Sequence, residues 1–178
     1  GGLVTNWYSS NLYSESSQLL LDFLYQQNPS TIDAFFTSNN FSLYKTDFIK
    51  IGGFSTRFRT SAGEDREFCV RARNMGLRLR LNESIKINHA HYLTFKSFFR
   101  LHKKYGAAAY EYQLEMSKQN INVTKKPKLN FYIRLLKFPF SRSKYNLSQK
   151  VKIDLLLLIC QLAVVTGYFH NRFRLIRQ

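Results

Sequence analysis

Hydrophobic side chains recur with a helical period in four stretches of the chain. The predicted helices cover residues 14–27, 45–51, 64–75 and 94–118. Ser14 or Ser16 can cap the first helix, and Asn28-Pro29-Ser30 ends it. Gly52-Gly53 stops the second helix, because at least one of these glycines supplies a positive φ, and residues 74–76 stop the third. The residues predicted to face inward on the longest helix are Phe95, Phe98, Phe99, Tyr105, Ala109 and Tyr112.

Other stretches have the apolar runs or the period-two alternation of strands. Residues 34–36 predict a short buried strand that leaves through a polar turn at residues 37–40. Residues 41–44 fit either a second short strand or an extended connection, and residues 77–81 alternate Leu with Arg. Residues 84–91 alternate again, with one face made of Ile85, Ile87, His89 and His91. Together with the helices, these segments predict a mixed α/β fold.

The last third of the chain has a different pattern. Residues 129–140 mix aromatic and aliphatic residues with Arg134 and Lys137, and residues 153–169 are strongly apolar. A membrane-spanning helix needs about 20 predominantly apolar residues, and polar residues interrupt this segment after its core at 155–159. A helix lying in or shallowly inserted into the membrane interface is favoured. A single span and a core helix packed on the rest of the domain remain open.

Charge is concentrated in this same region. The net charge is +16, and residues 118–178 carry 13 Lys and Arg against one acid, Asp154. Such a tail predicts an anionic partner, either nucleic acid or the inner leaflet of a membrane. A nucleic-acid partner is disfavoured, because no aromatic stacking platform, zinc motif or helix-turn-helix pattern accompanies the charge. Cys69 and Cys160 form no disulfide or metal pattern, which favours a reducing compartment.

The most informative polar cluster is the adjacent pair Glu64-Asp65, which follows Gly63 at the start of a predicted helix. Free backbone N–H groups and the helix dipole favour the charged form there, so Asp65 is expected to be ionised near neutral pH. An ionised carboxylate on a rigid turn can accept a proton from an attacking hydroxyl. On the residues alone, plain helix capping is the better interpretation.

Two further groups could contact a ligand. His89 and His91 lie on one face of a predicted strand, and imidazole is a frequent ligand of divalent metals, although two histidines do not make a site. A basic stripe on the long helix could bind a diphosphate or lipid headgroups, and a solvated helix face is the ordinary explanation for it. The stripe comprises Lys96, Arg100, Lys103 and Lys104.

Taken in order, these pieces resemble family-2 glycosyltransferases, which have the A-type glycosyltransferase fold. The resemblance covers residues 34–110, and residues 1–27 are similar to the preceding stretch in one bacterial branch. The matching segments are residues 35–40, 48–54, 63–68, 71, 76–79, 88–91, 99–100 and 105–106. The Gly52-Gly53-Phe54 turn followed at this distance by Glu64-Asp65 is the most specific pairing among them.

The resemblance implies roles for particular residues. Asp65 matches the base that acts on the acceptor hydroxyl in inverting members, and Glu64 matches its acidic neighbour. The residues implied to lie beside the acceptor are Gly52, Gly53, Phe54 and Asn39. His89, or less favourably His91, matches a histidine near the metal and the donor diphosphate, and Arg100 is implied to lie near the donor phosphates or the membrane face. The implied cofactor is a divalent metal, Mn or Mg, and the implied partners are a nucleotide-sugar donor and a sugar or lipid-linked acceptor.

The sequence departs from the family in one respect. Such enzymes hold the nucleotide and metal through an Asp-x-Asp motif in an N-terminal half, and no Asp-x-Asp occurs here. We therefore predict the C-terminal part of an A-type domain, a mixed short sheet with helices, over residues 1–118. A basic linker at 119–128 and a helical tail at 129–178 follow, attached to the cytoplasmic face of a membrane. We expect no sugar transfer by this chain alone.

The expected process is the synthesis of a bacterial cell-surface polysaccharide or glycolipid. The alternative is a non-catalytic basic module that binds a membrane or nucleic acid.

Overall fold

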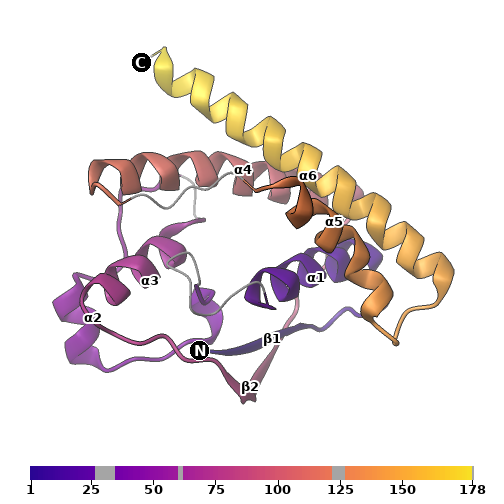
Figure 1. The fold of residues 1–178 in the computed structure, drawn as a ribbon, viewed down its shortest axis with the longest axis horizontal. Helices are drawn as coiled ribbons and strands as arrows, with labels where there is room; N and C mark the ends of the chain where they lie inside the picture. Colours follow the sequence, from indigo (N-terminus) through magenta and orange to yellow (C-terminus); the bar gives the residue numbers. More distant parts are fainter. Residues whose placement is uncertain (27–34, 60–61, 122–126, 178) are drawn as a thin grey trace.

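A computed structural model describes residues 1–26, 35–59, 62–121 and 127–177. The chain forms a two-stranded sheet and six α-helices within these ranges, with the longest helix last (Figure 1). The elements, in order, are β1 (Gly2–Asn6), α1 (Leu12–Gln26), η1 (Ser38–Asn40), α2 (Lys45–Ile51), α3 (Glu64–Asn74), β2 (Asn82–His89), α4 (Phe95–Lys118), α5 (Leu129–Lys137), η2 (Pro139–Ser141) and α6 (Leu147–Ile176).

The sheet pairs β1 with β2 in parallel, in a register that places Val4 beside Ile87 and Asn6 beside His89. Strand β2 confirms most of the strand predicted at residues 84–91. Strand β1 was not predicted, because a five-residue segment with only two large apolar side chains has too little alternation to identify. The pairing with β2 is what makes β1 a strand, and its register brings the end of β1 beside the end of β2.

Two predicted strands are wrong in the described part of the chain. Phe35 and Phe36 belong to no strand, and the backbone N–H groups of Phe36 and Thr37 donate instead to Cys69 Sγ and the Tyr25 hydroxyl. Ala34 and residues 28–30, which were expected to end the first helix, lie outside the described residues. Residues 77–81 also form no strand, although their alternation is real, because Leu77 and Leu79 pack on the core around Phe68. Residues 41–44 are an extended connection.

The four helices predicted in the first two thirds of the chain are confirmed. The cap predicted for the first helix is wrong, because α1 begins at Leu12 and the side chain of Asn11, not that of Ser14 or Ser16, accepts a hydrogen bond from the backbone N–H of Ser14. Gly52 and Gly53 both have positive φ, +90° and +67°, after α2, and Gly63 and Gly76 flank α3 with φ of +96° and +84°. These left-handed positions suit glycine because it lacks a Cβ. Thr94 caps α4 through a reciprocal pair of hydrogen bonds with Ser97.

The inward face predicted for α4 is only partly right. Phe98 and Tyr112 are buried, but Phe95 and Tyr105 are 51 % and 42 % exposed. Their places in the interior are taken by smaller or polar side chains, namely His102, Ala108 and Met116. The prediction placed the large aromatic side chains inward, whereas the close approach of α6 determines which side chains of α4 are buried.

That approach depends on two glycines. A Cβ added to Gly106 of α4 would lie 1.9 Å from the carbonyl oxygen of Val164, and one added to Gly167 of α6 would lie 1.8 Å from that of Lys103. The two helix backbones therefore touch, as small residues allow at close helix crossings. Gly106 lies within an uninterrupted helix and serves this contact.

Helix α6 lies along one edge of the molecule, with α1, α4 and α5 on one side of it (Figure 1). Its inner face joins a core shared with α1 and α5, in which Ile153 and Leu157 pack with Leu19, Phe23 and Leu135. The helical tail therefore packs on the domain, while the domain boundaries themselves remain predictions. Of the helices in the described ranges, α6 alone is long and apolar enough to cross a bilayer, and a core helix can pass the same test.

The predicted fold class is confirmed. The molecule is a mixed α/β structure with a short sheet, several helices and a helical C-terminal segment.

Candidate functional site

The candidate site forms around the first turn of α3, where Glu64 and Asp65 follow Gly63. The left-handed Gly63 allows the chain to turn sharply into the helix, and its Cα faces Phe58 and the Ala108 carbonyl of α4. Glu64 and Asp65 are half-buried there, and their charges act on the Tyr105 hydroxyl of α4. One oxygen of Glu64, Oε2, is buried and has no hydrogen-bond partner among the described residues.

Asp65 lies in a partly desolvated position between α3 and the η1 turn. Its Oδ1 accepts a 2.8 Å hydrogen bond from the backbone N–H of Arg66. Burial raises the pKa of Asp65 above its ordinary value and Glu64 adds to the rise, while the backbone N–H groups of Arg66 and Ser38 oppose it. The free N–H groups and the dipole at the helix start favour the charged form of Asp65, but the effect of desolvation on its pKa is larger. A raised pKa moves this carboxylate toward the range in which a base works best.

Helix α4 contributes Tyr105 to the same region, and His102 precedes it by one turn on this helix. Burial raises the pKa of the Tyr105 hydroxyl, and the nearby charges of Asp65 and Glu64 raise it further. The phenol therefore stays protonated and can donate a hydrogen bond. The ring of His102 lies 5.7 Å from that of Tyr105, centroid to centroid, and 4.5 Å from that of Phe98.

His102 is an unusual buried group. It is 1 % exposed, and neither ring nitrogen has a hydrogen-bond partner among the described residues. Burial, with a smaller effect from His91, lowers the pKa of His102 to about 4, so the ring is neutral at physiological pH. Unsatisfied buried nitrogens are costly and frequently mark functional sites.

The predicted histidine pair lies at the end of β2, with the ring centroids of His89 and His91 5.5 Å apart. Burial and the neighbouring His89 lower the pKa of His91, which keeps it neutral and able to bind a metal through a lone pair. However, no group of three or more His, Cys, Asp or Glu side chains among the described residues converges to hold a metal ion. The described residues thus fit at most part of a metal site, and we derive no step through a metal.

The residues predicted to bind the acceptor fall into two places. Asn39 lies in η1, next to Ser38, and so belongs to the turn that touches Asp65. The Gly52-Gly53-Phe54 turn lies farther along α3. Arg71 holds it there by donating to the carbonyls of Ile51 and Gly53, while its guanidinium also pairs with buried Glu67.

The ring of Phe54 packs on that of Phe68 in a tilted arrangement, with 5.0 Å between centroids, so it is an anchor of the turn as well as a candidate contact. Arg100 is exposed on α4. It lies two residues before His102, which places it on the opposite side of the helix. The roles predicted for the turn in acceptor binding and for Arg100 in phosphate binding therefore stay predictions.

Sequence reasoning gave no role to Ser38, Tyr105 or His102, although residues 35–40 and 105–106 are among the segments that resemble the family. No local signal could have identified them. Ser38 acts through its backbone, and a single histidine in an amphipathic helix usually indicates packing. The stripe Lys96, Arg100, Lys103 and Lys104 drew attention to α4, but it does not include Tyr105 or His102.

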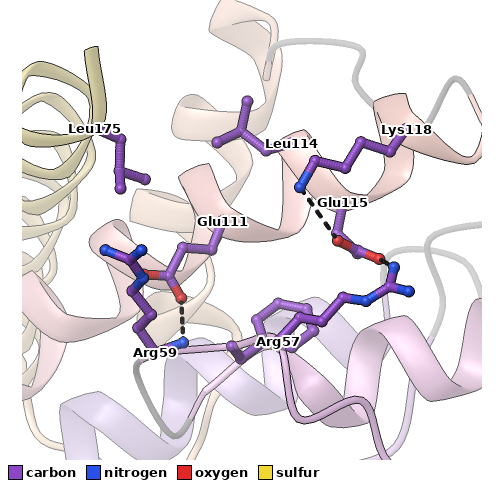
Figure 2. Close-up of a pocket in the computed structure, with 8 residues that line it drawn as sticks. Arg57, Arg59, Glu111, Leu114, Glu115, Lys118 and Leu175 are labelled. Carbon is purple, nitrogen blue, oxygen red and sulfur yellow. Dashed lines mark hydrogen bonds and ion pairs between the residues drawn. The ribbon is translucent and has the colours of Figure 1, made fainter. Parts of the chain in front are cut away.

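A hollow lies beyond this region, between the Arg57–Arg59 loop, the second half of α4 and the end of α6 (Figure 2). Its two carboxylates are already engaged. Glu115 pairs with Arg57 and Lys118, and Glu111 accepts a 3.0 Å hydrogen bond from the backbone of Arg59. These pairs anchor the loop that leads into α3, so the hollow is a structural ion-pair region.

Comparison with known protein families is informative over part of the chain. Residues 23–97 match the family described as the N-terminal domain of galactosyltransferase. No characterised protein and no solved structure matches the chain significantly. The matched segment contains Asn39, the Gly52-Gly53-Phe54 turn, Glu64, Asp65 and both histidines of the pair, but it ends before Arg100 and His102. Residues 23–97 therefore resemble a glycosyltransferase domain, which supports a general role in glycosyl transfer.

Proposed function

We propose that this chain carries the acceptor side of an enzyme that transfers a sugar from a nucleotide-diphosphate sugar to an acceptor hydroxyl. The observation that supports this most is Asp65. It is a carboxylate with a raised pKa, held on a helix start beside Glu64 and Tyr105, within the segment that matches a galactosyltransferase family. An inverting mechanism of the family-2 type, on an A-type fold, is the form of the reaction that we favour.

In this mechanism the acceptor oxygen attacks the anomeric carbon of the donor sugar. The bond from that carbon to the diphosphate oxygen breaks as the new glycosidic bond forms, and the nucleoside diphosphate leaves. Asp65 takes the proton from the attacking hydroxyl, which is the contribution of a general base. The protonated phenol of Tyr105 is suited to orient a carboxylate or a sugar hydroxyl at this place. Glu64, with an unpartnered buried oxygen, is suited to accept a hydrogen bond from the acceptor.

We further propose a sugar or lipid-linked acceptor, in the synthesis of a bacterial cell-surface polysaccharide or glycolipid. When bound, a divalent metal, Mn or Mg, would neutralise charge on the leaving diphosphate. His89 and His91 can supply two imidazole ligands, and the others would come from outside the described residues. Arg100 and the Gly52-Gly53-Phe54 turn keep their proposed places beside the donor phosphates and the acceptor.

The first prediction concerns Asp65→Asn in the natural protein that carries this sequence. We expect kcat to fall by about 10²–10⁴-fold, because the amide cannot accept the hydroxyl proton. Binding of the nucleotide-sugar donor should be nearly unchanged. Transfer is measured with radiolabelled donor, and donor binding by calorimetry.

The matched control is Asp47→Asn, which changes an aspartate in the first turn of α2. It should leave kcat close to that of the wild type. Wild-type turnover in Asp65→Asn would remove Asp65 from the role of base. A protein that binds no donor and transfers no sugar, even before mutation, would favour the non-catalytic basic module.

A further inference from the structure

Helix α6 has two apolar faces, and only one of them is covered. The inner face is buried against α1 and α4 through Ile153, Leu157, Cys160 and Ala163. On the opposite side, exposed apolar residues recur every three or four positions along the whole helix. This outer stripe consists of Leu147, Val151, Leu155, Leu158, Leu162, Val165, Phe169, Phe173 and Ile176.

The outer stripe is continuous and contains no polar residue. Its members are between 44 % and 70 % exposed, and a helix of 30 residues is about 45 Å long. Single exposed hydrophobic residues are normal on a protein surface, but a contiguous apolar surface of this length indicates an interaction surface.

The edges of the stripe are cationic. Three exposed side chains flank it: Lys152, Arg172 and Arg177. The only acid in α6 is Asp154, whose partial burial raises its pKa to about 6, so the cations of this helix outnumber its one carboxylate. An apolar face bordered by lysine and arginine is the pattern of helices that lie in the interface of an anionic membrane.

The inner face determines how the helix can lie in such a membrane. Asn171 donates to the carbonyl of Ala107 and to Glu111, and Tyr168 donates to Gln113, so the second half of α6 is attached to α4. The backbones also touch at Gly106 and Gly167. Helix α4 carries five Lys or Arg and two Glu, and a spanning α6 would draw these charges into hydrocarbon.

We propose that the outer stripe of α6 lies in the plane of an anionic bilayer, with α4 and the Asp65 region on its aqueous side. Pairing of two copies through the stripe is less favourable, because it would bring two cationic borders together without neutralising them. A bilayer that contains acidic lipids covers the apolar stripe and neutralises its borders at the same time.

The test uses the full chain and vesicles of phosphatidylcholine with or without one-third phosphatidylglycerol. We expect sedimentation with the anionic vesicles and at least tenfold weaker partitioning for Leu158→Gln/Leu162→Gln. The matched control, Tyr44→Gln/Ile49→Gln, replaces two exposed apolar residues near α2 and should bind as the wild type does. Arg172→Gln/Arg177→Gln should lose most of the preference for the anionic vesicles. Circular dichroism checks that each variant remains folded.

Depth measurements distinguish an α6 that lies in the plane of the bilayer from one that spans it. Tryptophan is introduced singly as Val151→Trp, Leu162→Trp and Phe173→Trp in a Trp7→Phe background, and quenching by brominated lipids is compared. Equal, shallow depths at the three positions support the proposal, whereas a much deeper central position would show a span. The proposal is also overturned if the stripe variant binds vesicles as well as the wild type. A wild-type dimer that this variant converts to a monomer, without any vesicle binding, would assign the stripe to a second copy.

Discussion

At the scale of single residues, the candidate site depends on how burial changes acid–base behaviour. Desolvation shifts the pKa values of Asp65 and His102 in opposite directions. Burial raises the pKa of the Asp65 carboxyl and lowers that of the His102 imidazole, because in each case the neutral form is favoured. Each shift has a measurable consequence.

For Asp65, the consequence is the pH dependence of the proposed reaction. A base must be deprotonated to act, so kcat/KM should rise with pH through the pKa of Asp65 and level off above it. Because that pKa is raised, the rise should lie above the range of an exposed aspartate. The pH profile of transfer measures this. Glu64→Gln should shift the rise to lower pH, since Glu64 contributes to raising the pKa of Asp65.

For His102, the consequence is stability. The unfolded chain takes up a proton near pH 6.5, while the folded chain does so only at about 4. The free energy of unfolding should therefore fall as pH decreases from 6.5 to 4, by roughly 3 kcal/mol from this group. His102→Phe should flatten that dependence, as measured by urea denaturation at several pH values. His170→Phe, at an exposed position on α6, should leave it unchanged.

At the scale of elements, the contact between α4 and α6 organises the second half of the molecule. Helix α4 faces the Asp65 region on one side and α6 on another, so the position of α6 fixes where Tyr105 and His102 lie. The two glycines at the crossing allow the backbones to approach closely. In most helices alanine would be the more stable residue at such positions.

Gly106→Ala tests that crossing. Elsewhere the substitution would stabilise the helix by about 1 kcal/mol, but here the new methyl group would meet the backbone of Val164, which cannot rotate away. We expect a net loss of about 2–4 kcal/mol in the free energy of unfolding. Ala109→Gly on the same helix is the reference, with an expected loss of about 1 kcal/mol. A more stable Gly106→Ala protein would contradict the close crossing.

At the scale of the whole molecule, one buried carboxylate connects the first helix to the C-terminal part of the chain. Glu15 of α1 is 3 % exposed and accepts hydrogen bonds from Lys144, Tyr145 and Asn6. Burial alone would raise the pKa of Glu15, but these three partners hold it below its ordinary value. The segment that leads into α6 is thereby fixed to α1 at a definite position.

Glu15→Ala should cost roughly 3 kcal/mol in the free energy of unfolding at neutral pH, because it leaves the buried hydroxyl of Tyr145 without its acceptor. The stabilisation by Glu15 is present above pH 4.5 and is lost as pH falls through its lower folded-state pKa. The difference between the wild type and the variant should therefore shrink in acid. Glu83→Ala, at an exposed position in β2, is the control and should change stability little.

The sequence by itself determined the features that depend on neighbouring residues. Helices α2, α3 and α4 begin and end close to where capping residues and glycines predicted, because these signals act over one turn. It also placed Glu64 and Asp65 at a helix start. Residues 77–81 show the limit of local pattern, since their alternation reports burial of leucines and not the presence of a neighbouring strand.

Only the tertiary structure decided which distant groups meet. Helix α6 is apolar on both sides, so its periodicity could not select the buried face, and Gly106 and Gly167 make that selection through backbone contact. The placement of Tyr105 near Asp65 likewise requires α4 to pack across α3, and the lowered pKa of His102 requires the neighbours that bury its ring. The physical reason is the same in each case: desolvation and close packing depend on neighbours in space, which a local sequence pattern does not contain.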